Sequence, residues 1–306
     1  MNKGRVLSIN GGNYEVLLED NTTIVARCGG KLRNYKMSKD STFTEKKNKL
    51  SSKIETKNIK LSPKAGDIVV LEDNMISSIE PRKNSLIRPD VANIDRILLV
   101  FAAKEPTFNY YLLDLFLVNI LRENIRPVIV ISKIDLCSDF ELLELKEGLF
   151  YYENTLGFDV FYVNSKKDYP RDLIELLGHG ITVVAGQTGA GKSTLINAMI
   201  PGFNLKTDEI SQALGRGKHT TRVVNLYHFK DGFLGDTPGF SKLDLHNITK
   251  YNLKDYYSEF NNYHCKFNDC LHQENSHGCD VLSHIGDGIK KTRYENYIKM
   301  LKSLEK

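Results

Sequence analysis

The sequence contains no hydrophobic segment long enough to cross a membrane. No apolar run among its 306 residues reaches the roughly 18 residues that a membrane-spanning helix needs. The N-terminal stretch MNKGRVLSINGG also lacks the apolar core of a signal peptide, so we expect a cytoplasmic protein with no membrane partner. The chain has no internal repeat, no long low-complexity tract and a modest net charge of +4. Its length and ordinary composition allow two or three globular domains.

Cysteine is scarce, with five residues in the chain. Three of them, Cys265, Cys270 and Cys279, are clustered, and no general disulfide framework is visible. In a cytosolic chain this clustering favours a metal site over disulfides. His272 completes a Cys₃His set that can close a tetrahedron around one structural Zn²⁺. His277 remains an alternative fourth ligand, and reduced cysteines without a metal remain the alternative to a site.

The pattern of expected elements divides the chain into three regions. Residues 1–82 contain short strand-like segments such as RVLSI and DIVVLED, separated by turn residues, which is typical of a small β-barrel. Residues 31–64 form a polar insert with eleven Lys and Arg residues against three acids. Apolar strands and helices alternate over 83–243, which indicates a parallel, doubly wound sheet with helices on both faces. Residues 244–306 are expected to form a helical domain, with a helix at its start, then the cysteine cluster and then a final helix.

The polar insert has two interpretations. Its positive charge would favour contacts with the phosphates of RNA, with strong salt sensitivity. The alternative is a mobile, solvated charged loop without a partner.

The stretch GQTGAGKST at 186–194 satisfies the P-loop pattern G-x-x-x-x-G-K-[ST]. It follows the expected strand ITVV and precedes the expected helix TLINAMI, which is the context that the motif demands. Glycines let backbone N–H groups turn toward phosphate oxygens, and the helix N-terminus adds favourable partial charge. We expect Lys192 to bridge the β- and γ-phosphates and Ser193 to ligate Mg²⁺. The expected nucleotide contacts are Gly186, Gln187, Thr188, Gly189, Ala190, Gly191, Lys192, Ser193 and Thr194.

The segment GDTPGF begins at Gly235, at the end of another expected strand. Asp236 can hold Mg²⁺ through water, and the N–H group of Gly239 can donate to the γ-phosphate. An unrelated turn is the alternative.

A phosphate site does not distinguish ATP from GTP, but the stretch ISKID at 131–135 supplies a candidate base reader. It follows the apolar strand PVIVI, where a doubly wound sheet places its ligand loops. The Asp135 carboxylate can accept from the N1 and N2 donors of guanine, while the Lys133 stem packs along the base plane. A surface Lys–Asp pair is the alternative. The expected contacts of this loop are Ser132, Lys133, Ile134 and Asp135.

A second loop, VNSKKD, follows the next expected strand, and its Ser165 and Lys166 could support the same base with a backbone N–H group. Both base loops thus precede the P-loop, whereas the usual GTPase order begins with the P-loop. Ligand loops lie on one edge of such a sheet whatever its connectivity, so the order indicates a circular permutation.

The permuted motif order, the small N-terminal barrel and the C-terminal Cys/His cluster together resemble the family of ribosome small subunit-dependent GTPase A, the RsgA family, over nearly the whole chain. The resemblance implies an OB-fold barrel, a circularly permuted P-loop GTPase domain and a zinc-binding domain. It also implies a late role in maturation of the bacterial 30S ribosomal subunit, with GTP hydrolysis stimulated by the subunit. It favours 16S rRNA as the ligand of the barrel, and we expect a monomer that binds no DNA.

The segment GRGKHTTRVVNLYHF looks like switch one of that family. The resemblance implies that Thr221, with Thr220 as the neighbouring choice, contacts Mg²⁺ when GTP is bound. Phe240 stands where many GTPases hold a water-orienting Gln, and it cannot hydrogen-bond to water. His219 then becomes the candidate for positioning water, with Lys192 and Thr221 as the other catalytic candidates. The alternative for His219 is contact with RNA or solvent.

Three features depart from the family pattern. Ser132 stands where the family usually has Asn, and its single hydroxyl lacks an amide donor pair. Its contacts to the base or the P-loop should therefore weaken, while Asp135 keeps guanine selectivity. The insert at 31–64 is longer than expected, and the gap between His272 and Cys279 is one residue longer.

The sequence as a whole predicts a Mg²⁺-dependent GTPase that hydrolyses GTP to GDP and phosphate during 30S assembly. GTP would order the switches and hydrolysis would release them, changing the affinity for the ribosome. Two other functions stay open. One is a P-loop ATPase or kinase, in which ATP would displace bound GDP as well as GTP does. The other is an RNA-binding scaffold with a degenerate nucleotide site.

Overall fold

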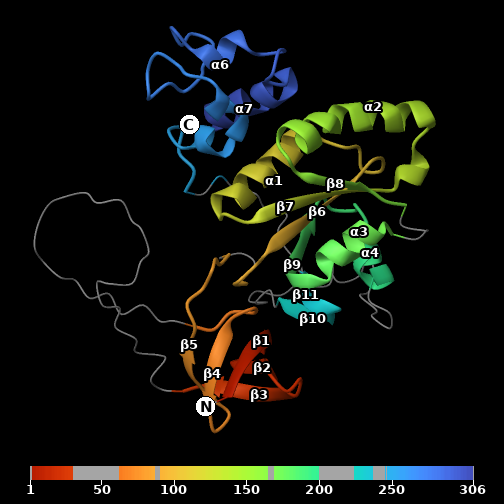
Figure 1. Ribbon diagram of the computed structural model, residues 1–306, viewed down its shortest axis with the longest axis vertical. Coiled ribbons are helices and arrows are strands. Elements are labelled where there is room, and N and C mark those ends of the chain that lie inside the picture. Colours follow the sequence, from red (N-terminus) through yellow and green to blue (C-terminus); the bar gives the residue numbers. More distant parts are fainter. Residues whose placement is uncertain are drawn as a thin grey trace, which may run out of the picture.

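The computed structural model describes residues 2–29, 62–86, 90–164, 169–199, 224–236, 245 and 247–305. These residues form an N-terminal barrel, a central sheet covered by helices, and a helical C-terminal region (Figure 1). In the view of Figure 1 the barrel lies below the central sheet and the C-terminal region lies above it. Among the described helices, none has the length and apolar character to cross a bilayer.

The barrel is closed and five-stranded, in the order β1-β2-β3-β5-β4, which confirms the predicted small barrel and fits an OB-fold. Its sequences alternate apolar and polar residues, so one side chain in two points inward, as Tyr14 and Val16 do on either side of exposed Glu15. Val69 and Ile76 meet them in the barrel core. The strands are β1 (Asn2–Asn10), β2 (Asn13–Leu18), β3 (Thr23–Cys28), β4 (Ile68–Glu72) and β5 (Met75–Ile79).

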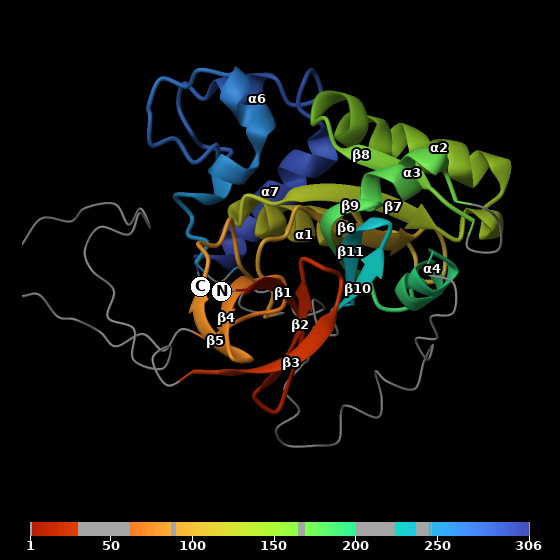
Figure 2. The same ribbon diagram turned by 60° about the horizontal axis from the view of Figure 1, so that its bottom comes forward.

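The barrel rests against the edge of the central sheet, where β1 contacts β10, as Figure 2 shows. The Arg5 guanidinium lies 5.4 Å from the centre of the Phe233 ring, and Leu7 packs on the core of the sheet. These contacts fix the barrel on the side of the sheet that carries the last two strands.

The central sheet has six strands in the order β10-β11-β9-β6-β7-β8, and only its edge strand β10 runs antiparallel. The inner strands read as continuous apolar runs because both of their faces are covered by helices. Strand β9, which leads into the P-loop, lies beside β6, although β6, β7 and β8 all precede it in the sequence. The strand order is therefore permuted relative to a domain whose first strand leads into the P-loop. The strands are β6 (Arg96–Ala102), β7 (Arg126–Ser132), β8 (Asp159–Tyr162), β9 (His179–Gly186), β10 (Asn225–Phe229) and β11 (Asp231–Asp236).

Alternate residues of the strands enter two separate cores, one on each face of the sheet. Leu99 packs with α1 and the end of α2 on one face, while its neighbour Leu98 packs with α3 and α4 on the other. This two-faced packing confirms the predicted doubly wound sheet. The helices are α1 (Tyr110–Arg122), α2 (Asp139–Phe150), α3 (Arg171–Leu177) and α4 (Lys192–Met199), and a π-helical turn, η3 (Tyr151–Thr155), continues α2.

The C-terminal region packs its own apolar core around Tyr257, Phe260 and Tyr297. A helix was expected at its start, but the described chain there forms two 3₁₀ helices, because the Asn- and Tyr-rich sequence favours turns over a regular helix. The final helix was expected and is present as α7. The elements are η5 (Leu253–Tyr256), η6 (Ser258–Asn262), α6 (Asp280–Ser283) and α7 (Lys291–Ser303).

A buried ion cluster joins this region to helix α1. Arg293 of α7, 1% exposed, donates to the carboxylates of Asp114 on α1 and Glu259 on η6. The Tyr152 hydroxyl donates to Asp114 at 2.8 Å, and the guanidinium lies 4.5 Å from the Tyr257 ring centre. Opposite charges and hydrogen bonds offset much of the cost of burying these charges, although Oε2 of Glu259 has no hydrogen-bond partner among the described residues. The cluster therefore fixes α7 on α1.

Candidate functional site

The base loop forms where β7 ends at Ser132. Lys133 adopts a left-handed conformation, with φ of 56°, and the next residues form a short 3₁₀ helix, η2 (Ile134–Leu136), which leaves Asp135 exposed. Burial holds Ser132 in place, whereas the carboxylate that should read the base faces solvent. This placement suits a side chain that must reach a ligand.

The P-loop forms at the same edge, between the end of β9 at Gly186 and the start of α4 at Lys192. Gly186 has φ of 130°, and a Cβ atom there would lie 2.1 Å from the carbonyl oxygen of Val100, so only glycine fits. The Lys192 ammonium folds back over the loop, donating to the carbonyl oxygens of Gly186 at 3.1 Å and Gln187 at 2.7 Å. Ser193 lies half-buried in the first turn of α4. Phosphates are expected at this point of the loop.

A hydrogen bond joins the base loop to the P-loop across 58 residues of sequence. The Ser132 hydroxyl donates to the carbonyl oxygen of Ala190 at 2.6 Å, and the carbonyl oxygen of Phe101 lies 3.2 Å away. A contact between this position and the P-loop is therefore present. The expectation that serine makes it weaker than asparagine would stays a prediction. The two segments therefore converge at one edge of the sheet, as the permuted motif order requires.

A third segment, residues 105–107, contacts both loops, although no motif in the sequence marks it. The Lys133 ammonium donates to the carbonyl oxygen of Glu105 at 2.5 Å, and the Gln187 side-chain amide donates to the carbonyl oxygen of Thr107 at 3.3 Å. This segment follows β6, the strand beside the P-loop strand. Its position in the sequence could have identified it, because ligands of such sheets bind at loops that follow the carboxyl ends of the central strands.

The Asp236 backbone ends β11 level with Val184 of β9, so it lies at the same sheet edge as the P-loop. Several other predicted site residues lie outside the described chain, and their roles remain predictions. These residues are Ser165, Lys166, His219, Thr220, Thr221, Gly239 and Phe240.

The candidate metal ligands Cys265, Cys270, His272 and Cys279 come together in the C-terminal region, with their ligand atoms all within 4.8 Å of one another. The sulfurs of Cys265 and Cys279 are 3.7 Å apart, and Nδ1 of His272 lies 3.4 Å from Cys279. Zinc–sulfur bonds of about 2.3 Å in a tetrahedron separate two sulfurs by about 3.8 Å, so the spacing fits the ion. His277 is exposed and lies outside this group.

Helix α7 and η6 contact the segment that carries His272 and fix its position. The hydroxyls of Tyr294 and Tyr297 donate to the carbonyl oxygens of His272 and Leu271, both at 2.8 Å, and the Phe260 ring packs edge-on against His272. Burial lowers the pKa of His272 to about 4, so the imidazole is neutral, which is its metal-binding form. Four protein ligands leave no open position, so the site suits structure rather than catalysis.

The fold and the site together define a circularly permuted P-loop nucleotide-binding protein with a Cys₃His cluster whose spacing fits a metal ion. Residues 79–246 match the RsgA GTPase family. A small ribosomal subunit biogenesis GTPase RsgA from Phytoplasma australiense is 40% identical, with the match covering 100% of this chain and 97% of the relative. The chain therefore belongs to the RsgA family, and it is a GTPase.

Two solved structures resemble this fold. YjeQ from Thermotoga maritima superposes with a TM-score of 0.80 at 30% identity, over 99% of this chain and 98% of that one. YloQ, described as a circularly permuted GTPase, superposes with a TM-score of 0.74 at 30% identity, over 99% and 94%. These similarities confirm the predicted family and the permuted GTPase fold, and they favour GTP hydrolysis over an ATPase, a kinase or a scaffold without turnover.

Proposed function

We propose that this protein binds the 30S ribosomal subunit late in its maturation and hydrolyses GTP to GDP and phosphate faster when bound. The proposal is carried by the convergence of a base loop and a P-loop, joined by Ser132 and Ala190, in a member of the RsgA family. Relatives of 40% identity are named small ribosomal subunit biogenesis GTPases, which supports the same role here.

Guanine recognition is assigned to the base loop. Asp135 would accept hydrogen bonds from the base edge, and Lys133 would lie along the base plane. Ile134 supplies backbone to the same loop, and Ser165 and Lys166 would add a backbone N–H group from the second loop. The exposure of Asp135 at the carboxyl edge of β7 supports this assignment, because ligands of such sheets bind at that edge.

Phosphate binding is assigned to the whole P-loop from Gly186 to Thr194, with Lys192 bridging the β- and γ-phosphates. Ser193, Thr221 and Asp236 would hold Mg²⁺, which neutralises charge on the phosphates when it is bound. The Gly239 N–H group would donate to the γ-phosphate. His219 would orient the attacking water, because Phe240 offers no hydrogen bond for that task.

Zinc is assigned to Cys265, Cys270, His272 and Cys279, and the spacing of the ligand atoms supports the assignment. A structural ion contributes its binding free energy to folding of the region around it.

The same proposal assigns residues 1–82 to a barrel domain with the insert 31–64, residues 83–243 to the GTPase domain and residues 244–306 to the zinc domain.

The partner is assigned as the small subunit and its 16S rRNA, contacted through the OB-fold barrel and the basic insert. Family membership and the charge of the insert support RNA binding. We further propose a cytoplasmic monomer, in keeping with a ribosome assembly factor.

GTP turnover with and without purified 30S subunits tests the proposal. We expect slow turnover alone and a rise of at least about tenfold with subunits, since a missing water-orienting Gln leaves hydrolysis dependent on a partner. ATP should not displace bound GDP. The proposal would be contradicted by GTP turnover that does not change when 30S subunits are added, or by ATP that displaces bound GDP as well as GTP does. His219→Ala should abolish the stimulation while leaving subunit binding intact.

A further inference from the structure

The outer face of α2 carries a stripe of exposed apolar side chains. Phe140, Leu143 and Phe150 are 75%, 56% and 61% exposed. At about 100° per residue these positions fall on one side of the helix, away from Leu145 and Leu149, which pack on the sheet core. Four of the eight large apolar side chains that are exposed in the described chain lie between residues 136 and 150, so the stripe is a local concentration.

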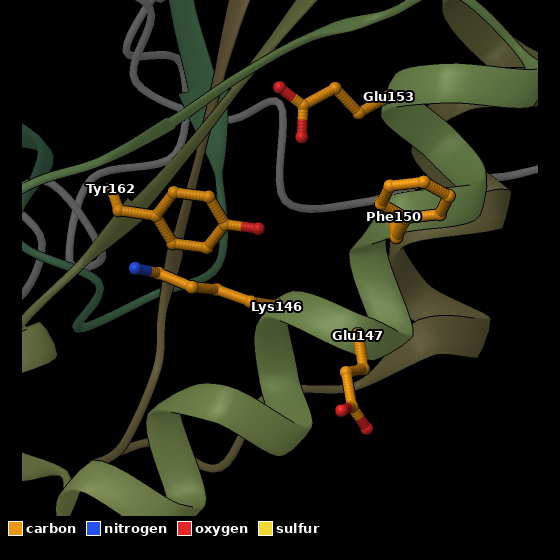
Figure 3. A pocket seen from close by; sticks show the side chains of 5 residues that line it. All are labelled: Lys146, Glu147, Phe150, Glu153 and Tyr162. Atoms are coloured by element: carbon orange, nitrogen blue, oxygen red, sulfur yellow. The ribbon is translucent and has the colours of Figure 1, made fainter.

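An open pocket of about 440 Å³ continues this stripe toward β8 (Figure 3). Figure 3 shows Lys146 and Glu153 extending toward Tyr162, while Glu147 points away from it along the helix. The Lys146 ammonium lies 5.3 Å from the Tyr162 ring centre, and Phe150 forms another wall of the pocket. The surface therefore combines aromatic walls with carboxylates at the rim.

The same surface is acidic in a chain whose net charge is positive. Residues 139–155 contain five acids and a single Lys. Glu141 is engaged by Lys104 at 2.8 Å and by the helix cap at Ser138. Glu144, Glu147 and Glu153 form no ion pair with any residue that the structure describes, and all three are exposed.

This combination selects one class of partner. A nucleic-acid backbone would bring phosphates against unpaired carboxylates, which repel them. A polypeptide with apolar anchors flanked by Lys or Arg would bury the stripe and pair with the rim carboxylates. Proteins that sit on RNA carry an excess of such basic residues.

We propose that the α2 docking face, defined as Phe140, Leu143, Glu144, Glu147 and Phe150 with the adjoining pocket, binds a basic protein of the small ribosomal subunit. This inference rests on the proposed function and names a protein contact within it. The capping box of Ser138 and Glu141 and the ion pair to Lys104 fix the first turn of α2, so the face is preorganised for docking.

Three substitutions at exposed positions test the apolar part of the face. The variant Phe140→Ser, Leu143→Ser, Phe150→Ser should bind purified 30S subunits at least about tenfold more weakly, as expected when several apolar anchors are removed. Its GTP turnover without subunits should equal that of the wild type. The matched control Phe140→Leu, Leu143→Met, Phe150→Leu keeps the apolar character and should bind like the wild type.

The outcomes separate this inference from the proposed function. Wild-type protein that does not bind 30S subunits contradicts the proposed function, and this inference falls with it. Wild-type binding with an unimpaired serine variant contradicts only the docking face. An apolar control that loses as much affinity as the serine variant also contradicts it, because apolar character would then not be what the partner recognises.

A photoreactive benzoylphenylalanine placed at Leu143 identifies what covers the face. Irradiation with purified 30S subunits should cross-link a ribosomal protein, through a peptide that contains Lys or Arg beside apolar residues. Cross-links to rRNA, or to another copy of this chain, would overturn the proposal. Glu144→Lys with Glu147→Lys should weaken subunit binding several-fold at low salt, and tighter binding by this variant would favour RNA instead.

Discussion

The nucleotide loops are held by a few hydrogen bonds at an exposed sheet edge, whereas the C-terminal metal region is held by buried charges and aromatic packing. Asp135 faces solvent, and Ser132 supplies a single bond from the base loop to the P-loop. In the metal region, His272 and Arg293 are buried and have several partners. Loops at an exposed edge can change conformation when a ligand binds, whereas a buried cluster keeps the C-terminal region in one conformation.

The comparison is tested most severely by removal of the metal ligands. Cys270→Ser should abolish zinc binding and unfold the C-terminal region, because structural zinc contributes on the order of 10 kcal/mol of binding free energy. GDP affinity should persist, since the nucleotide edge lies on the central sheet. Zinc content and thermal unfolding measure the effect, and Cys28→Ser on the barrel is the control. One zinc per chain with an unchanged melting temperature in Cys270→Ser would contradict the assignment.

Breaking the ion cluster should have the next largest effect. Asp114→Ala leaves the Arg293 guanidinium buried beside one carboxylate fewer, and the loss of one partner of a buried pair costs about 3–5 kcal/mol. Urea unfolding should show this loss, together with release of α7 from α1.

The exposed pair of Lys3 and Glu80 on the barrel serves as the control for Asp114→Ala. Lys3→Met should leave the urea unfolding midpoint nearly unchanged, since exposed ion pairs contribute little to stability. Equal losses of unfolding free energy in the two variants would contradict the claim that the buried cluster fixes α7 on α1.

A smaller effect is expected at the nucleotide edge. Ser132→Ala removes the donor to the Ala190 carbonyl oxygen. We expect a loss of about 1–2 kcal/mol of GTP binding free energy, which corresponds to an affinity lower by about five- to thirtyfold. The matched control is Ser77→Ala, whose hydroxyl donates to the carbonyl oxygen of Val70 in the barrel. That control should lose stability without losing GTP affinity. Unchanged nucleotide binding in Ser132→Ala would show that the bond does not position the P-loop.

The sequence predicted those features that local pattern determines. Apolar runs located the strands of the central sheet, and the fixed spacing around Lys192 located the P-loop between strand and helix. The cysteine spacing located the Cys₃His cluster. Each of these signals lies within a short stretch, so one sequence carries it in full.

The features that depend on distant pairs could not be predicted in this way. Arg293 meets Asp114 across 179 residues, and nothing around either residue marks the other. The position of Glu105 against Lys133 likewise appears only when the strands are placed side by side. Such contacts follow from tertiary packing, which local propensity does not specify.

The most direct measurement of the central claim is the nucleotide preference of Asp135→Asn. Xanthine carries a carbonyl where guanine carries an amino group, so an amide that donates should favour it. If the base loop and the P-loop close over one nucleotide, this variant should lose GTP affinity by roughly 100-fold or more and gain affinity for XTP. Lys192→Ala added to it should remove binding of both nucleotides. An Asp135→Asn variant that still prefers GTP would contradict the account.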